Sequence, residues 1–290
     1  MRAPAVLADY YELSKPRIIL LLLVTTAAAM VMAARGMPSL ALLFWTLLAG
    51  ALSAASAGAL NCVWDADIDR VMKRTQSRPI PAGRISRRNA TIYALAAAAV
   101  SFAIFYVLVD PLAAWLALAG NVYYVGIYTM WLKRITPLNI VVGGAAGSVP
   151  PLVGWAAVTH TVGTPALGLF ALIFLWTPPH FWSLALTTET EYGKAKIPML
   201  PNVCGRERTK REIVYYSLLL VAASLVLYPL HVMGAFYFGA AAVLGGIFVL
   251  DALRTWREQR GTLAARNLFR YSLLYLALMC AVMVVDRIVS

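Results

Sequence analysis

The chain has 290 residues, of which 61% are hydrophobic and only 13% are charged, and its mean hydropathy is +0.73. A soluble domain usually carries about 25% charged residues, so this composition excludes an ordinary soluble fold. Apolar runs recur along nearly the whole length, which predicts an all-α polytopic membrane protein rather than a barrel of short alternating strands. The net charge of +12 does not indicate a nucleic-acid partner, because excess Lys and Arg in a membrane protein first report orientation.

Nine apolar segments each approach the roughly 20 residues that a helix needs to cross a bilayer. They cover residues 17–34, 40–63, 91–109, 112–132, 138–158, 165–186, 213–230, 232–251 and 270–288. The turns at Asp110-Pro111 and near Pro229 are very short. The proline pairs at 150–151 and 178–179 are expected to break two spans, which hints at a cavity. We therefore predict nine transmembrane helices around a central cavity, in a single integral-membrane domain over residues 1–290.

Orientation follows from the basic residues. If the N-terminus lies in the cytoplasm, only Arg35 and Arg287 of the 25 Lys and Arg residues fall on the outer side. Basic residues concentrate in cytoplasmic loops. The distribution therefore predicts an odd number of spans, with the N-terminus inside and the C-terminus outside.

Residues 61–84, NCVWDADIDRVMKRTQSRPIPAGR, combine acidic and basic side chains at the end of the second span. Asn61, Asp65 and Asp69 follow an i, i+4, i+8 spacing, which places them on one helical face. Mg²⁺ typically takes one or two carboxylates and completes its shell with phosphate oxygens of a substrate. The alternative is a solvated helix end with ordinary salt bridges, as most charge runs are. The surrounding membrane sequence favours a metal–diphosphate site.

A second cluster follows the sixth span, on the same predicted side. Glu189 and Glu191 offer carboxylates for a second Mg²⁺, and the basic residues Lys194 and Lys196 can hold diphosphate oxygens. The alternative is an inside loop that merely obeys the orientation rule, and for any single basic residue this alternative is the better one. His180 lies within the span near this cluster.

Further polar residues lie at membrane depth. Tyr124 and Tyr128 are spaced i, i+4 on the fourth span, and a small-residue run at 143–147 allows close helix packing. No charged residue falls at the middle of a predicted span, which argues against a proton-coupled transporter.

These residues, with several longer segments, resemble the intramembrane aromatic prenyltransferases. Asn61, Asp65 and Asp69 match the pattern NxxxDxxxD of that superfamily. The segments similar to its haem-farnesylating branch are KPR at 15–17, DxDIDRVMKRTxxRPIPxGRI at 65–85, TPLNIVVGGAAGSVPPLVGW at 136–155, WTPPHFWSLAL at 176–186 and YxxAxIPMLP at 192–201. One departure is that Thr187 and Glu191 occupy the register of the superfamily's second DxxxD motif, so one carboxylate is missing or replaced by Glu189.

The resemblance implies transfer of the farnesyl group of farnesyl diphosphate to a vinyl group of haem B, with addition of water, to give haem O for terminal oxidases. It implies Mg²⁺ as cofactor, held by Asn61, Asp65, Asp69 and Glu191. Diphosphate would be bound by Lys73, Arg78, Lys133, Lys194 and Lys196. Asp65, Asp69, Tyr124 and Tyr128 would be catalytic, with the tyrosine rings facing an allylic cation, and His180 would bind the haem iron or a propionate.

The resemblance also implies a cell inner membrane location, an active site facing the cytoplasm, and a haem A synthase or oxidase-assembly protein as partner. Two alternatives remain open. A sibling prenyltransferase would act on a quinone or chlorin precursor, and only the branch-specific segments argue against it. A membrane transporter would need a functional polar group near the bilayer midplane, which the sequence lacks.

Overall fold

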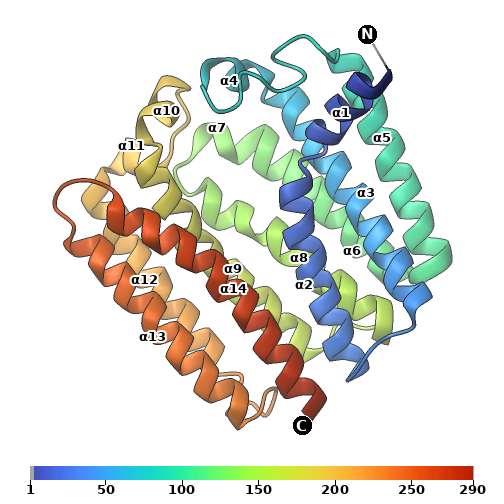
Figure 1. Ribbon diagram of the computed structural model, residues 1–290, viewed down its shortest axis with the longest axis vertical. Helices are drawn as coiled ribbons and strands as arrows, with labels where there is room; N and C mark the ends of the chain where they lie inside the picture. The colour runs from blue at the N-terminus through green and yellow to red at the C-terminus, as the bar shows by residue number, and fades with distance from the viewer. Residues whose placement is uncertain (1–2, 290) are drawn as a thin grey trace.

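The computed structural model describes residues 3–289, and every regular element within that range is helical (Figure 1). The elements are α1 (Ala3–Leu13), α2 (Pro16–Ala34), α3 (Leu40–Trp64), α4 (Ala66–Val71), α5 (Arg87–Ile104), η1 (Phe105–Val109), α6 (Pro111–Val122), η2 (Tyr123–Leu132), α7 (Lys133–Ile135), α8 (Asn139–Thr159), α9 (Thr164–Thr187), α10 (Glu189–Lys194), α11 (Leu200–Cys204), α12 (Arg206–Leu225), α13 (Ala235–Arg257) and α14 (Leu263–Val289).

Eight stretches of the described chain are long and apolar enough to cross a membrane. They agree with eight of the nine predicted spans, and this confirms a multi-pass helical membrane protein. The remaining predicted span, 213–230, corresponds to α12, which packs along α9 and α13. Its first seven residues, RERTKRE, are too polar for it to count as a span by composition. The number nine and the orientation of the termini therefore stay predictions.

The turns explain where the predicted boundaries were wrong. Helix α12 ends at Leu225 and α13 begins at Ala235, so the connection is longer than the predicted break near Pro229. Proline cannot donate a backbone hydrogen bond, and the chain instead folds back so that the N–H groups of Val232 and Met233 reach the carbonyl of Leu227. The other predicted break is confirmed, because Asp110 caps α6 by accepting the Ala113 N–H at 2.8 Å.

The proline pairs do not break their spans, contrary to the prediction. Helix α8 runs continuously through Pro150 and Pro151, and α9 runs through Pro178 and Pro179. Membrane helices tolerate proline where neighbouring helices and hydroxyl side chains compensate for the lost bond. In α9 the Thr177 hydroxyl donates to the Ile173 carbonyl at 2.8 Å, within the turn that precedes the pair.

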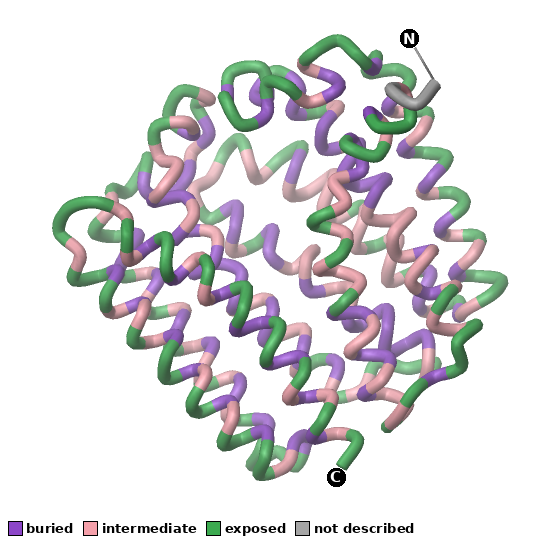
Figure 2. The backbone as a smooth tube through the Cα atoms, viewed as in Figure 1, coloured by how far each residue is buried: buried purple, intermediate pink, exposed green. Residues whose placement is uncertain are grey.

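Helices α8 and α9 form the centre of the bundle. Their apolar windows are 56% and 67% buried, against 22–39% for the other spans. Small residues allow this close packing, since a Cβ on Gly154 would lie 2.3 Å from the Thr26 carbonyl oxygen of α2, and one on Gly144 would lie 3.0 Å from Thr177 of α9. The helices around them are mostly exposed on their outer faces (Figure 2), as expected of surfaces that face lipid.

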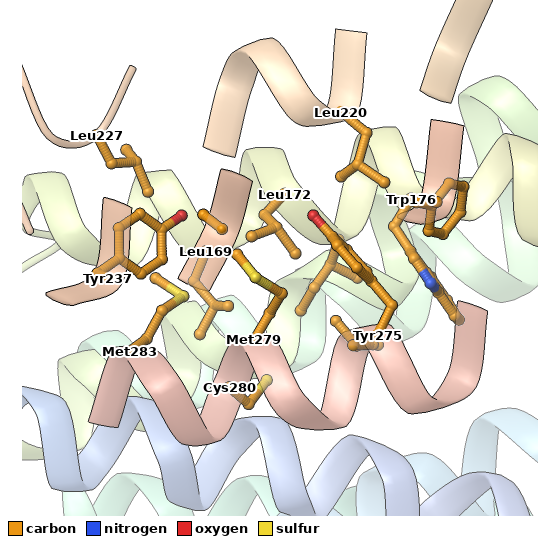
Figure 3. Packing of buried hydrophobic residues seen from close by; sticks show 14 of the residues in the cluster. Leu169, Leu172, Trp176, Leu220, Leu227, Tyr237, Tyr275, Met279, Cys280 and Met283 are labelled. Carbon is orange, nitrogen blue, oxygen red and sulfur yellow. The ribbon is translucent and has the colours of Figure 1, made fainter. Parts of the chain in front are cut away.

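The main apolar core joins α9, α12, α13 and α14. Figure 3 shows Leu169 and Leu172 of α9 facing Met279 and Met283 of α14, with Tyr237 of α13 beside them. The short helices α4, α10 and α11 lie at the end of the bundle where the chain begins, and the chain ends at the opposite side (Figure 1). The predicted acidic and basic clusters therefore share one end of the molecule.

The glycine contacts of α8 give a matched test of this packing. Replacing Gly154 by Ala should lower the free energy of unfolding by about 1–3 kcal/mol, because the new methyl group meets α2 backbone that cannot rotate away. Replacing Gly147 of the same helix, where an added Cβ would meet no atom within 4 Å, should cost nothing measurable. Unfolding in mixed micelles measures both, and equal effects would contradict the close α2–α8 contact.

Candidate active site

The centre of the site is a buried polar network around Asp65, at the junction of α3 and α4. Asn61 lies one turn earlier and donates from Nδ2 to Asp65 Oδ2 at 2.8 Å and to Thr129 Oγ1 at 3.1 Å. The Lys15 ammonium donates to Asn61 Oδ1 at 2.5 Å, and the Lys133 ammonium pairs with Asp65. Because Asp65 is only 1% exposed, its charge depends on these partners.

The fourth span reaches this network through a π-helical stretch, η2. It carries Tyr124, Tyr128 and Thr129, and Lys133 follows it directly. The two tyrosine rings stack with centroids 5.5 Å apart. Gly143 of α8 makes room for them, since a Cβ there would lie 2.2 Å from the Tyr128 ring. π-helical turns are rare and frequently mark functional sites.

Asp69 is paired with a residue of the following loop. Arg78 donates two hydrogen bonds to its carboxylate, at 2.9 and 2.8 Å, and Thr75 donates to its backbone carbonyl at 3.0 Å. Burial alone would lower the pKa of Arg78, but the charge of Asp69 outweighs it and the pKa is raised. Arg78 thus stays cationic beside the predicted metal ligand.

The same loop is fastened to α1. Arg84 donates to Asp9 at 2.7 Å and to Glu12 at 3.0 Å. These bonds hold the basic loop against the N-terminal helix, and thereby fix the position from which Arg78 reaches Asp69.

Asp67 lies at the surface, unlike the buried Asp65 and Asp69. It accepts two hydrogen bonds from Arg134, at 2.9 and 2.8 Å. These bonds are the main reason that the pKa of Asp67 is lowered to about 2. Its side chain is 57% exposed. Asp67 is therefore the surface partner of Arg134, and it is not among the residues predicted to bind the metal.

The second cluster contributes Glu191 from α10. Its Oε2 atom is buried and has no hydrogen-bond partner among the described residues. Glu189 is turned toward α12, where it accepts from Arg206 at 3.1 Å. The neighbouring Tyr192 is buried and interacts with the Arg74 side chain, while burial raises the pKa of its phenol.

The two clusters meet in one apolar contact group. Ile68 and Met72 come from the first segment, and Tyr192, Ile197 and Met199 from the second. Ile140 of α8 and Ala185 of α9 complete the group. Tyr128 and Phe181 pack against this group. The segments after the second and sixth predicted spans therefore share one contact group, against which Tyr128 packs, while the convergence of their carboxylates on one ion stays a prediction.

His180 is buried in α9 near the same group. Its ring stacks on Trp176, with centroids 4.2 Å apart, and on Phe269 of α14 at 4.8 Å. Its Nδ1 atom lies 2.7 Å from the Ser272 hydroxyl. A role in haem binding stays a prediction.

The remaining predicted diphosphate ligands are on the surface. Lys73, Lys194 and Lys196 are exposed, and none makes an ion pair with another described residue. They are available to an anion from solution, whereas Arg78 is paired with Asp69 and Lys133 with Asp65.

Sequence reasoning missed Lys15, Thr129 and Arg74. Lys15 lies in the KPR segment at 15–17. The similarity of this segment to the haem-farnesylating branch marked Lys15 as a candidate but did not indicate its role. Thr129 carried no signal, because its contact with Asn61 depends on the wide turns of η2. Arg74 is one of many loop cations, and its pairing with Tyr192 requires the fold.

The residues present fit a divalent metal by their chemistry. Oδ1 of Asp65 and Oε2 of Glu191 are both buried carboxylate oxygens without a hydrogen-bond partner among the described residues. Such oxygens are the ligands that Mg²⁺ prefers. Within residues 3–289, however, no three His, Cys, Asp or Glu side chains are grouped closely enough to hold an ion together. The predicted four-residue ligand set and the predicted central cavity stay predictions.

Comparison with known families identifies the chain. Residues 22–274 match the model of the UbiA prenyltransferase family. The chain belongs to that family. Among curated UbiA relatives, the protoheme IX farnesyltransferases of Trichodesmium erythraeum and Synechocystis sp. are each 52% identical to it. The alignments cover 98% of this chain and 87% and 90% of those proteins.

Solved structures share the fold. Digeranylgeranylglyceryl phosphate synthase superposes with a TM-score of 0.82 at 16% identity, over 99% of this chain and 100% of that one. A UbiA homolog from Archaeoglobus fulgidus bound to GPP and Mg²⁺ superposes with a TM-score of 0.67 at 20% identity, over 95% and 99%. At these identities the likeness supports the arrangement of helices only.

The adjacent residues Lys133 and Arg134 test how far the network depends on burial. Replacing Lys133 by Met removes the cation from the buried Asp65 and should lower the free energy of unfolding by about 3–5 kcal/mol. Replacing Arg134 by Met breaks the mostly exposed pair with Asp67 and a longer contact of 3.8 Å with Asp65 Oδ1, and should cost less, about 1 kcal/mol. Denaturation in detergent without substrate measures both. A smaller loss for Lys133→Met than for Arg134→Met would contradict the buried network.

Proposed function

We propose that this chain transfers the farnesyl group of farnesyl diphosphate to a vinyl group of haem B, with addition of water, to give haem O. The observation that carries the proposal is the 52% identity to protoheme IX farnesyltransferases over almost the whole chain. The family match over residues 22–274 supports a single prenyltransferase domain. The apolar contact group that joins the two segments beside Tyr128 supports the proposal from this chain's own residues.

The diphosphate would lie where the carboxylates and cations meet. Lys133 and Arg78 are already held at Asp65 and Asp69, so both cations lie beside the carboxylates that would hold the metal. Each cation would contact phosphate oxygens of a bound diphosphate, for which a guanidinium fork and an ammonium are both suited. The exposed Lys73, Lys194 and Lys196 would attract the anion from solution.

Asn61, Asp65, Asp69 and Glu191 would hold Mg²⁺. When bound, this ion neutralises charge that develops on the diphosphate leaving group. The solved UbiA homolog from Archaeoglobus fulgidus, which was bound to GPP and Mg²⁺, supports this cofactor. The buried oxygens of Asp65 and Glu191 support it from this chain's own residues.

The tyrosines of η2 would face the farnesyl carbon as it loses the diphosphate. Their rings present a negative quadrupole that stabilises a nearby cation. The apolar contact group around Tyr128 would keep water away from that carbon until the vinyl group attacks. The bond from carbon to diphosphate oxygen breaks, a carbon–carbon bond forms, and water then supplies the hydroxyl and releases a proton.

His180 would serve the haem side of the site. Phe181, the next residue, packs against the group that contains Tyr128, and its ring lies edge-on to His180. The haem and the farnesyl chain would therefore meet near Phe181. Each substrate would then have its own helices, with the diphosphate on α3, α4 and η2.

Neighbouring aspartates provide the test of the metal site. Asp65→Asn keeps the shape but removes a ligand charge, and should reduce haem O formation by about 100-fold or more. Asp67→Asn, which alters only the surface pair with Arg134, should retain most of the activity. Detergent-solubilised membranes are incubated with Mg²⁺, farnesyl diphosphate and haem B, and the pigment is analysed by mass spectrometry.

The same assay separates the alternatives. Prenylation of a quinone or chlorin precursor with no haem product would favour the sibling enzyme. Unchanged activity of Asp65→Asn would refute the proposed metal site. A transporter is disfavoured, because the short helices α4 and α10, which carry the acidic residues of the two clusters, lie at one end of the bundle and not at mid-depth (Figure 1).

The native cysteines test the proposed orientation in the cell inner membrane, with the site facing the cytoplasm. Cys204 is exposed in α11 at the site's end of the bundle, while Cys62 and Cys280 are buried. A membrane-impermeant maleimide should therefore label the chain in inside-out vesicles and leave it unlabelled in intact spheroplasts. Labelling of Cys204 from outside would reverse the predicted orientation.

A further inference from the structure

The hydrogen bonds of His180 specify which of its ring nitrogens carries a proton. Ser272 Oγ lies 2.7 Å from His180 Nδ1 and also 2.7 Å from the Phe269 carbonyl oxygen. A serine hydroxyl has one proton to donate. If that proton pointed to Nδ1, the hydroxyl and carbonyl oxygens would face each other at 2.7 Å without a proton between them. Both contacts are attractive only when Ser272 donates to Phe269 and accepts the Nδ1–H of His180.

The surroundings of the ring keep it neutral. His180 lies between the rings of Trp176 and Phe269, and none of the described acidic residues contacts it. A charged group in such a place would need an anionic partner. A neutral imidazole that is protonated at Nδ1 has a free lone pair at Nε2. Among the described residues Nε2 makes no hydrogen bond, and 8% of the residue's surface stays accessible.

Ser272 is itself held firmly. Its backbone carbonyl accepts a hydrogen bond from Trp176 Nε1 at 2.8 Å. Two residues one turn apart on α9, Trp176 and His180, thus bind one residue of α14. Figure 3 shows Trp176 at the end of the packed face that α9 and α14 share. The hydroxyl cannot move relative to the imidazole without separating the two helices.

We propose that Ser272 is a positioning residue that fixes His180 as its Nδ1–H tautomer, so that Nε2 ligates the iron of the haem substrate. This inference rests on the proposed function. It decides between the two roles considered for His180, because an unprotonated nitrogen is a ligand for iron and has no proton to donate to a propionate. Histidine ligands of metals commonly donate their other N–H to a fixed acceptor, and loss of that acceptor typically weakens metal binding about 10–100-fold.

The experiment uses the full-length protein in detergent with ferric haem B alone, so that no transfer occurs. Absorption and electron paramagnetic resonance spectra report the axial ligand, and titration gives the affinity. The wild type should show histidine ligation. His180→Ala should lose it, and added imidazole should restore it by entering the space that the ring left.

Substitutions at Ser272 then test the positioning role. Ser272→Ala should weaken haem binding about 10-fold or more, whereas Ser272→Thr, which keeps the hydroxyl, should stay within about threefold of the wild type. Ser217→Ala is the matched control. Ser217 on α12 is also fully buried and also donates to its own helix, at 2.6 Å to Ile213, but no imidazole contacts it. It should bind haem as the wild type does.

Two results would overturn the inference. One is histidine-type ligation that persists in His180→Ala, and the other is a loss in Ser272→Ala no larger than in Ser217→Ala. If His180→Ala fails to fold, the comparison of Ser272→Ala with Ser272→Thr and Ser217→Ala decides the question alone. Haem O formation by the wild type separates this failure from failure of the proposed function: product formed without His180 ligation refutes only the inference, while no product from the wild type refutes the proposed function.

Discussion

The structure depends on one buried carboxylate, that of Asp65, and on the separate segments that neutralise it. Lys133 comes from the end of the fourth span, Asn61 from the second, and Asn61 is in turn bound by Lys15, which precedes the first. An isolated buried charge costs several kcal/mol, whereas a charge with well-placed partners is tolerated. Removing any partner exposes that cost. The same requirement that ties these helices together also places cations where a diphosphate would be bound.

The two aspartates of the site are each paired with a cation of the same chain. Asp69 is bound by Arg78, as Asp65 is by Lys133, while single oxygens of Asp65 and Glu191 keep no hydrogen-bond partner among the described residues. Ion pairs of this kind can exchange with a metal and a diphosphate without leaving any charge alone. The proposed reaction would then begin with an exchange of partners, and would need no large movement of the spans.

Much of this was predictable from the sequence, for identifiable reasons. Apolar runs define membrane helices because every backbone group must be satisfied within the segment, so eight spans were located, with ends at most seven residues from those of the helices. The spacing of Asn61, Asp65 and Asp69 located the first cluster. The sequence did not reveal the continuity of α8 through its proline pair, or the π-helical turns that carry Thr129 to Asn61, because both depend on neighbouring helices. The tautomer of His180 likewise required Ser272, which lies 92 positions away.

The central claim is that the carboxylate of Asp65 leaves Lys133 to hold a metal when the diphosphate binds. The most direct measurement is an experimental structure of the full chain with Mg²⁺ and a non-hydrolysable farnesyl diphosphate analogue. The account predicts Asp65 on the metal, Glu191 turned toward the same ion, and Lys133 on a phosphate oxygen. An intact Asp65–Lys133 pair, with the analogue bound elsewhere, would contradict it.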